Sequence, residues 1–103
     1  MQAGDDNGSN GTADSRRVWM VERTYSSDSP NILVIVYATP DGEQYLQKEW
    51  EFNRFGAGRA PEVTAAIEAD VADLNPVEDA DRREQYATEA ERMQERHEPD
   101  DPV

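Results

Sequence analysis

The stretch LVIVYATPDGEQYLQKEWEF, residues 33–52, decides the fold because it contains two strand-like runs joined by a tight turn. Residues 32–39 (ILVIVYAT) are apolar at almost every position, which is typical of a central strand covered on both faces. Inside TPDGEQ, the proline and Gly42 are residues that hairpin turns favour. The second run, residues 44–55, alternates and places Trp50 on a half-buried face. The stretch therefore predicts a β-hairpin.

Two further segments extend this hairpin into a sheet. Residues 16–25 (RRVWMVERTY) predict an earlier strand, in which strict alternation would put Trp19, Arg23 and Tyr25 on one face. Residues 62–69 (EVTAAIEA) alternate like a strand, although their alanines also suit a helix. We favour a fourth strand for this segment.

The clearest helix is at residues 78–97, where Tyr86, Ala90 and Met93 recur at three- and four-residue spacing. Before it, Leu74 and Val77 are the apolar anchors of a connector. The predicted fold class is α+β: an antiparallel β-meander of three to four strands with one C-terminal α-helix packed on the sheet. We expect the helix stripe to cover the face of the strand at residues 32–39 that carries Val34 and Val36, which leaves the opposite face, at Leu33, Ile35 and Tyr37, without an assigned cover.

The expected organisation is one domain between two tails. Residues 1–15 read as a disordered acidic tail, residues 16–97 as a single α+β domain, and residues 98–103 as an acidic C-terminal tail. We expect both ends to be disordered. With no apolar segment of membrane-spanning length and no signal-like N-terminus, the expected location is cytoplasmic, with no membrane contact.

The charge of the chain indicates its environment. It has 23 acidic and 10 basic residues in 103, a net charge of −13, and Lys48 is its only lysine. Such an excess of one sign opposes compaction in dilute salt, whereas molar salt screens it over a Debye length of about 3 Å. This composition is typical of a protein from a salt-accumulating halophile. Residues 16–60 carry equal numbers of acidic and basic side chains, so we expect this neutral segment to provide the contact surface.

Little in the sequence points to catalysis. The chain has no cysteine and one histidine, His97, whose place in the last helical turn suits an ordinary interaction with the helix dipole. Glu49 and Glu51 share a strand face and could bind a cation, but solvated acidic surface is the simpler interpretation. We expect no enzyme, no cofactor and no metal site.

The neutral segment instead suggests an interaction face. We expect a protein partner, most simply a second copy in a homodimer, to bind a sheet face or an open edge strand. The candidate residues for that face, or for the core beneath it, are Trp19, Val21, Leu33, Ile35 and Tyr37, and Arg23 is a further candidate for the face. The alternative is single-stranded nucleic acid, because aromatic rings and basic groups coincide on the predicted sheet.

Three stretches carry a family resemblance: VWMVERTYS, VYATPDGEQY and DRREQYATEAERMQERHEPDD. Together they make the chain resemble an uncharacterised family of small acidic proteins from halophilic archaea, over about residues 17–101. The resemblance supports the halophilic interpretation. It implies no catalytic or binding residue.

Overall fold

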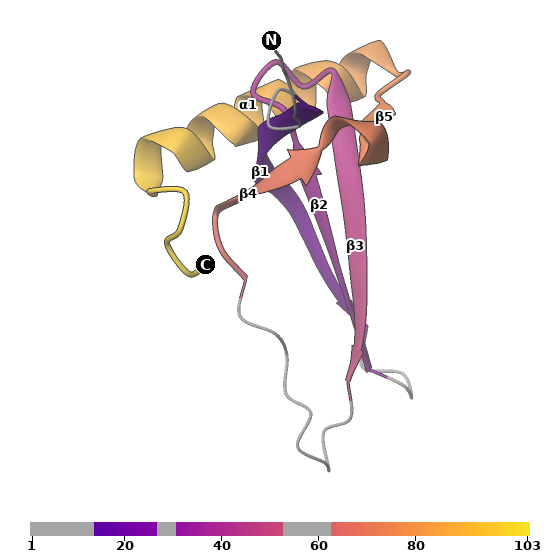
Figure 1. Cartoon of the computed structure of the whole chain (residues 1–103), viewed down its shortest axis with the longest axis vertical. Helices are drawn as coiled ribbons and strands as arrows, with labels where there is room; N and C mark the ends of the chain where they lie inside the picture. Colours follow the sequence, from indigo (N-terminus) through magenta and orange to yellow (C-terminus); the bar gives the residue numbers. More distant parts are fainter. Residues whose placement is uncertain (1–13, 27–30, 53–62) are drawn as a thin grey trace, which may run out of the picture.

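The structure, a computed structural model, describes residues 14–26, 31–52 and 63–103. Within these residues, five antiparallel strands form one sheet and a helix lies across one of its faces (Figure 1). The predicted α+β fold with a C-terminal helix is confirmed. The elements in chain order are β1 (Ser15–Ser26), β2 (Asn31–Ala38), β3 (Gln44–Phe52), β4 (Ala66–Asp70), the 3-10 helix η3 (Val71–Asp73), β5 (Asn75–Pro76) and α1 (Ala80–Arg96).

The strands β1, β2 and β3 form the predicted meander, with β2 in the centre. The order across the sheet is β4-β1-β2-β3-β5, so β4 pairs with β1 rather than following β3 as a fourth meander strand would. The two-residue strand β5 pairs with β3 only at Gln44 and Tyr45. The segment at residues 62–69 thus contributes a strand, as predicted, but on the opposite edge of the sheet.

The short link between β4 and β5 requires a strongly curled sheet. In the strand order, β4 and β5 are four strand positions apart, so a flat sheet would hold them about 19 Å from each other. The link from Asp70 to Asn75 includes the 3-10 helix η3, which rises only about 2 Å per residue. This link is therefore too short to span the distance across a flat sheet. The segment therefore crosses the concave side of the sheet, and Figure 1 shows β4 and the turn after it lying in front of the long strands.

This crossing segment covers the face of the central strand β2 that the helix does not cover. On the concave side, which we call the inner face, Leu74 packs in one cluster with Leu33, Ile35 and Tyr37. On the opposite side, which we call the helix face, Tyr86 of α1 packs with Val36, as expected from the helix stripe. Both faces of β2 are therefore buried within the chain near the helix. The helix covers only one end of the sheet, and β1, β2 and β3 extend well beyond it (Figure 1).

A β-bulge in β1 changes which side chains share a face. Met20 pairs with Tyr37 and Glu22 with the next residue, Val36, so Val21 is an extra residue in the ladder. Trp19 and Val21 pack on the helix face, whereas Arg23 and Tyr25 lie on the inner face. The prediction that Trp19, Arg23 and Tyr25 share a face is wrong, because one inserted residue reverses the alternation after it.

The β2–β3 turn also serves as a platform for the helix. Gly42 has φ +74°, and its N–H donates to the Thr39 carbonyl at 2.8 Å, which confirms the predicted hairpin. Asp41 accepts from the Thr39 hydroxyl at 2.5 Å and from the Glu43 N–H at 3.0 Å. A Cβ on Gly42 would overlap the backbone carbonyl of Arg83 in α1. The glycine is therefore required by the turn and by the helix that rests on it.

The C-terminal segment is ordered, contrary to the expectation that both ends are disordered. Val103 donates its N–H to Val63 at 2.8 Å, Ala65 donates to Asp101 at 2.9 Å, and Thr64 and Pro102 form an antiparallel bridge. The sequence gives little sign of this pairing, because the tail is short, acidic and rich in proline. The predicted N-terminal tail lies outside the described residues except for its last two, and Ser15 already begins β1.

The helix itself agrees closely with the prediction. Asp79 is its N-cap and accepts from the Arg82 N–H at 3.0 Å, and the helix ends before His97. Leu74 and Val77, the predicted anchors of the connector, are both buried. Among the described residues, no helix has the length and apolar character needed to cross a membrane.

Candidate interaction surfaces

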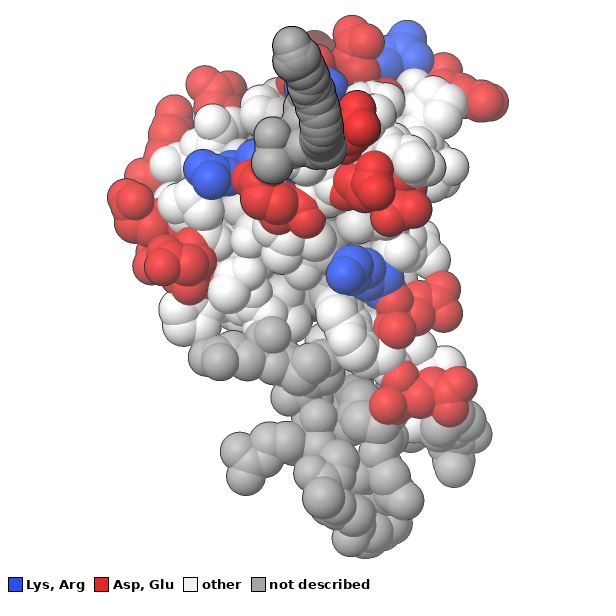
Figure 2. Space-filling view, in the orientation of Figure 1, with Lys and Arg blue, Asp and Glu red and all other residues white. Residues whose placement is uncertain are grey.

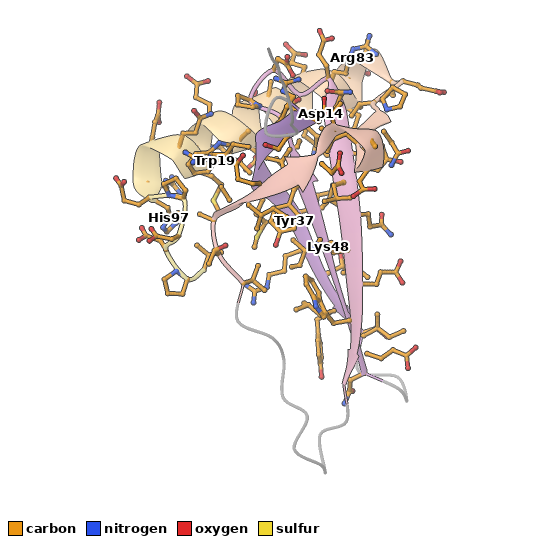
Figure 3. The ribbon with its side chains drawn as sticks, viewed as in Figure 1. Asp14, Trp19, Tyr37, Lys48, Arg83 and His97 are labelled. Carbon is orange, nitrogen blue, oxygen red and sulfur yellow. The ribbon has the colours of Figure 1, made fainter. Side chains whose placement is uncertain are left out.

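The six residues predicted to form an interaction face do not lie together. Leu33, Ile35 and Tyr37 are at most 3% exposed and form the inner core. Trp19 and Val21 pack on the helix face, where Trp19 meets Ala90 of α1. Figure 3 shows Trp19 close to the helix and Tyr37 on β2. A partner could reach the three β2 side chains only by opening the core.

Arg23, the sixth residue, is exposed on the inner face and holds the C-terminal segment. Its guanidinium donates to the Val103 carbonyl at 2.9 Å. Burial raises the pKa of Tyr37, and the charge of Arg23 lowers it by a smaller amount. The Tyr37 hydroxyl therefore stays protonated at neutral pH. Arg23 thus has a structural partner in the same chain.

The bulge nevertheless creates a basic and aromatic patch on the inner face. Arg23, Ile35 and the exposed Lys48 are in register across three strands. In the next row, Tyr25 and Trp50 flank Leu33. Tyr25 is 55% exposed and Trp50 is half-buried. The residues Arg23, Tyr25, Lys48 and Trp50 form what we call the inner patch.

The outer edge of β3 is open over most of its length. Within the described part of the chain, β5 pairs with β3 at Gln44 and Tyr45, and no strand pairs with it from residue 46 onwards. The open edge, residues 46–52, is about 20 Å long at the usual strand rise. The alternation of this strand predicts only that it is half-buried. The charges on both of its faces are the signal of an edge strand that could have been recognised.

Hydrogen-bond register shows which β3 groups are available at this edge. Thr39 donates to the Gln44 carbonyl at 3.0 Å, so the even-numbered residues of β3 direct their backbone groups toward β2. Val77 donates to the Glu43 carbonyl at 2.9 Å on the other side. The N–H and C=O groups of Gln47, Glu49 and Glu51 therefore point outward from the sheet.

A polar groove adjoins the open edge on the helix face. It has a volume of about 600 Å³ and lies between the start of α1, β3 and the segment around β5. Its lining includes Tyr45 and Gln47 from β3, and Glu22, Asp79, Arg82 and Tyr86. Carboxylates outnumber the single arginine in this lining. The groove therefore offers a negative, partly aromatic environment.

Tyr86 is the buried floor of this groove. It is 3% exposed, and its hydroxyl donates to Glu22 Oε1 at 3.5 Å. Burial is the main cause that raises the pKa of Tyr86, and the Glu22 carboxylate raises it further while Arg82 lowers it. The phenol therefore remains a hydrogen-bond donor at neutral pH.

Comparison with known proteins gives a family but no activity. The profile of a family of unknown function, DUF7967, matches residues 12–103. The chain belongs to DUF7967. No curated protein and no solved structure matches it. The DUF7967 match includes every element described above.

The titratable side chains of the DUF7967 chain are spread over its described residues without a metal-binding cluster. No group of three or more His, Asp or Glu side chains in that part of the chain could hold a metal ion. His97 lies at the end of α1, with its Nδ1 3.7 Å from the Asp101 carboxylate (Figure 3). Glu49 and Glu51 share the helix face of β3, as the alternation predicts. The site with the most distinct geometry is thus the open β3 edge with its adjoining groove.

Proposed function

We propose that this protein is a non-enzymatic protein–protein interaction module that binds an extended segment along the open edge of β3. The observation that carries this proposal is the row of outward backbone groups at Gln47, Glu49 and Glu51, which β5 leaves uncovered. An extended peptide can add to such an edge through main-chain hydrogen bonds, while side-chain positions supply specificity. The core already occupies the apolar faces of β2, so the edge is the better candidate for contact.

The proposal is tested by blocking the edge without disturbing the sheet. In Glu49→Pro the lost N–H points outward, so no bond to β2 is removed. Glu49→Thr keeps the N–H and is the matched control. Random extended nonapeptides displayed for selection should yield a class that binds wild type and Glu49→Thr but not Glu49→Pro. If no class distinguishes wild type from Glu49→Pro, the edge is not a binding site.

The second candidate function is binding of single-stranded nucleic acid by the inner patch. It is favoured by the register that places Arg23 and Lys48 beside Tyr25 and Trp50, since rings and cations together can stack and neutralise a single strand. The net charge of −13 opposes it. A labelled oligonucleotide should then bind wild type but not Lys48→Glu, as salt is lowered within the folded range. Equal binding or no binding by the two proteins would exclude this function.

We also propose that the protein works in the cytoplasm of a halophilic archaeon. Acidic side chains crowd α1 and the side of β3 in Figure 2, and their mutual repulsion needs screening. The midpoint of urea unfolding should rise steeply between 0.1 and about 2 M KCl, where the Debye length falls from about 10 Å to less than 3 Å. A midpoint that is independent of salt would contradict this environment.

A further inference from the structure

We infer that the segment bound at the β3 edge is basic on one face, with lysine or arginine at every second position and apolar residues between them. This inference rests on the proposed function and names the chemistry of the partner. It follows from the side chains that alternate along the open edge and from the charge of the adjoining groove.

The two faces of the open edge differ sharply in charge. The side chains of Gln47, Glu49 and Glu51 lie on the helix face, and Glu49 and Glu51 are exposed. On the inner face the same strand presents Lys48 and the half-buried Trp50. Carboxylates also gather beside the lower part of β3 in Figure 2. A new strand would therefore meet acids on one side and a ring with one cation on the other.

Side chains of an added strand follow the same alternation as those of β3. The residues opposite Gln47, Glu49 and Glu51 would project on the helix face, and opposite charges in such cross-strand pairs attract. The residues between them would lie beside Lys48 and Trp50, where apolar side chains bury surface against the ring. Alternating basic and apolar residues satisfy both faces at once.

The groove gives one of these basic side chains a deeper position. Gln47 lines both the open edge and the groove, so the side chain opposite it lies at the groove mouth. A long arginine or lysine there reaches toward the Glu22 carboxylate and the rings of Tyr45 and Tyr86. Carboxylate and aromatic faces are the two groups that bind such cations best. We therefore place the strongest basic anchor opposite Gln47.

A second copy of the chain is a poorer occupant of this edge. Two β3 strands pairing antiparallel about Glu49 would place the two Glu49 side chains directly opposite each other. Pairing about Lys48 would oppose the two lysines. Like charges directly opposite are destabilising in a sheet. The edge therefore selects a partner of the opposite charge pattern.

The test uses three synthetic peptides with wild-type protein. One alternates Arg and Val over nine residues, the second replaces Arg with Glu, and the third has the same composition as the first with its arginines contiguous. Binding is followed by titration calorimetry and by amide hydrogen exchange at residues 47, 49 and 51. With each cross-strand ion pair changing affinity by a factor of about two to five, the two pairs with Glu49 and Glu51 should make the alternating basic peptide bind about 4- to 25-fold more tightly than either other peptide.

Two variants separate the inference from the proposed function. Glu49→Lys with Glu51→Lys keeps the backbone edge and should reverse the preference toward the Glu peptide, whereas Glu49→Pro should abolish binding of both. If the Glu or contiguous peptide binds wild type equally well and protects the three amides, the edge binds segments but the charge pattern is wrong. If light scattering in molar salt gives a dimer that Glu49→Pro dissociates, the occupant is a second copy and the inference is overturned. If no peptide protects these amides and no dimer forms, both the inferred charge pattern and the proposed function are wrong.

Discussion

Replacing Gly42 by alanine should loosen the contact between the β2–β3 turn and α1. An alanine at φ +74° costs about 1–2 kcal/mol because its Cβ is crowded in the left-handed region. Its Cβ would also overlap the Arg83 carbonyl and lie 2.8 Å from the Ala87 nitrogen, both backbone atoms of α1. Overpacking of this kind costs about 1–3 kcal/mol. The expected loss in the free energy of unfolding is therefore about 2–5 kcal/mol.

Such a loss is a large share of the roughly 5–15 kcal/mol that stabilises a domain. With a urea slope of about 1 kcal/mol/M, the midpoint should fall by about 2 M or more. Unfolding is followed by tryptophan fluorescence, since Trp19 packs against α1, and by circular dichroism of the helix. Glu43→Ala, at an exposed position in the same turn, is the control and should change stability by less than about 0.5 kcal/mol.

A double variant tests the cause of this loss. Because Gly42 faces backbone atoms, shortening the side chain with Ala87→Gly cannot relieve the overlap. The Gly42→Ala, Ala87→Gly protein should therefore be no more stable than Gly42→Ala alone. A cost of about 1 kcal/mol or less for Gly42→Ala would refute the docking of α1 on the turn, because the backbone conformation alone accounts for that much.

Three further predictions test the core, the helix cap and the turn. Ile35→Ala should lower the free energy of unfolding by about 2–5 kcal/mol, because Ile35 is fully buried. Val34→Ala, at a half-buried position on the helix face, should lower it clearly less. Equal losses would mean that the inner face is not covered. Asp79→Ala should cost about 1 kcal/mol and fray the first turn of α1 in amide exchange, whereas an unchanged exchange rate would remove its capping role. The hydrogen bond from the Thr39 hydroxyl is the main cause that holds the pKa of Asp41 below its ordinary value of 3.8. The Asp41 carboxylate therefore stabilises the fold above pH 3.8, and this stabilisation is lost as the pH falls through the lower pKa of the folded state. Thr39→Val should raise the pKa of Asp41 in an NMR titration, and a pKa that does not move would show that the hydroxyl is not its main partner.

Much of this fold can be predicted from the sequence because its strongest patterns are local. The two-sided apolar run of β2, the proline and glycine of the turn, and the stripe of Tyr86, Ala90 and Met93 each specify an element by its own periodicity. These three features led to the correct α+β class and to the helix on the Val36 side of β2. Each depends on residues close together in the chain.

The features that were missed depend on long-range contacts. The bulge at Val21 leaves no clear mark in the sequence, yet it moves Arg23 and Tyr25 to the face opposite Trp19. Pairing of the C-terminal segment with residues 63–66 brings together acidic, proline-rich and alanine-rich stretches that have weak strand patterns. The placement of β4 beside β1 depends on pairing between residues 15–19 and 66–70, which lie far apart in the chain. The six candidate residues are consequently divided between the inner core, the helix face and the exposed part of the inner face.

Amide hydrogen exchange along β3 in the free protein tests the central claim most directly. We expect the rates to alternate: slow exchange at Leu46, Lys48 and Trp50, whose N–H groups bond to β2, and fast exchange at Gln47, Glu49 and Glu51, whose N–H groups point outward. Addition of the alternating Arg–Val peptide should slow the second set alone. Slow exchange at Gln47, Glu49 and Glu51 before any peptide is added would show that the edge is already covered and would contradict the proposed function.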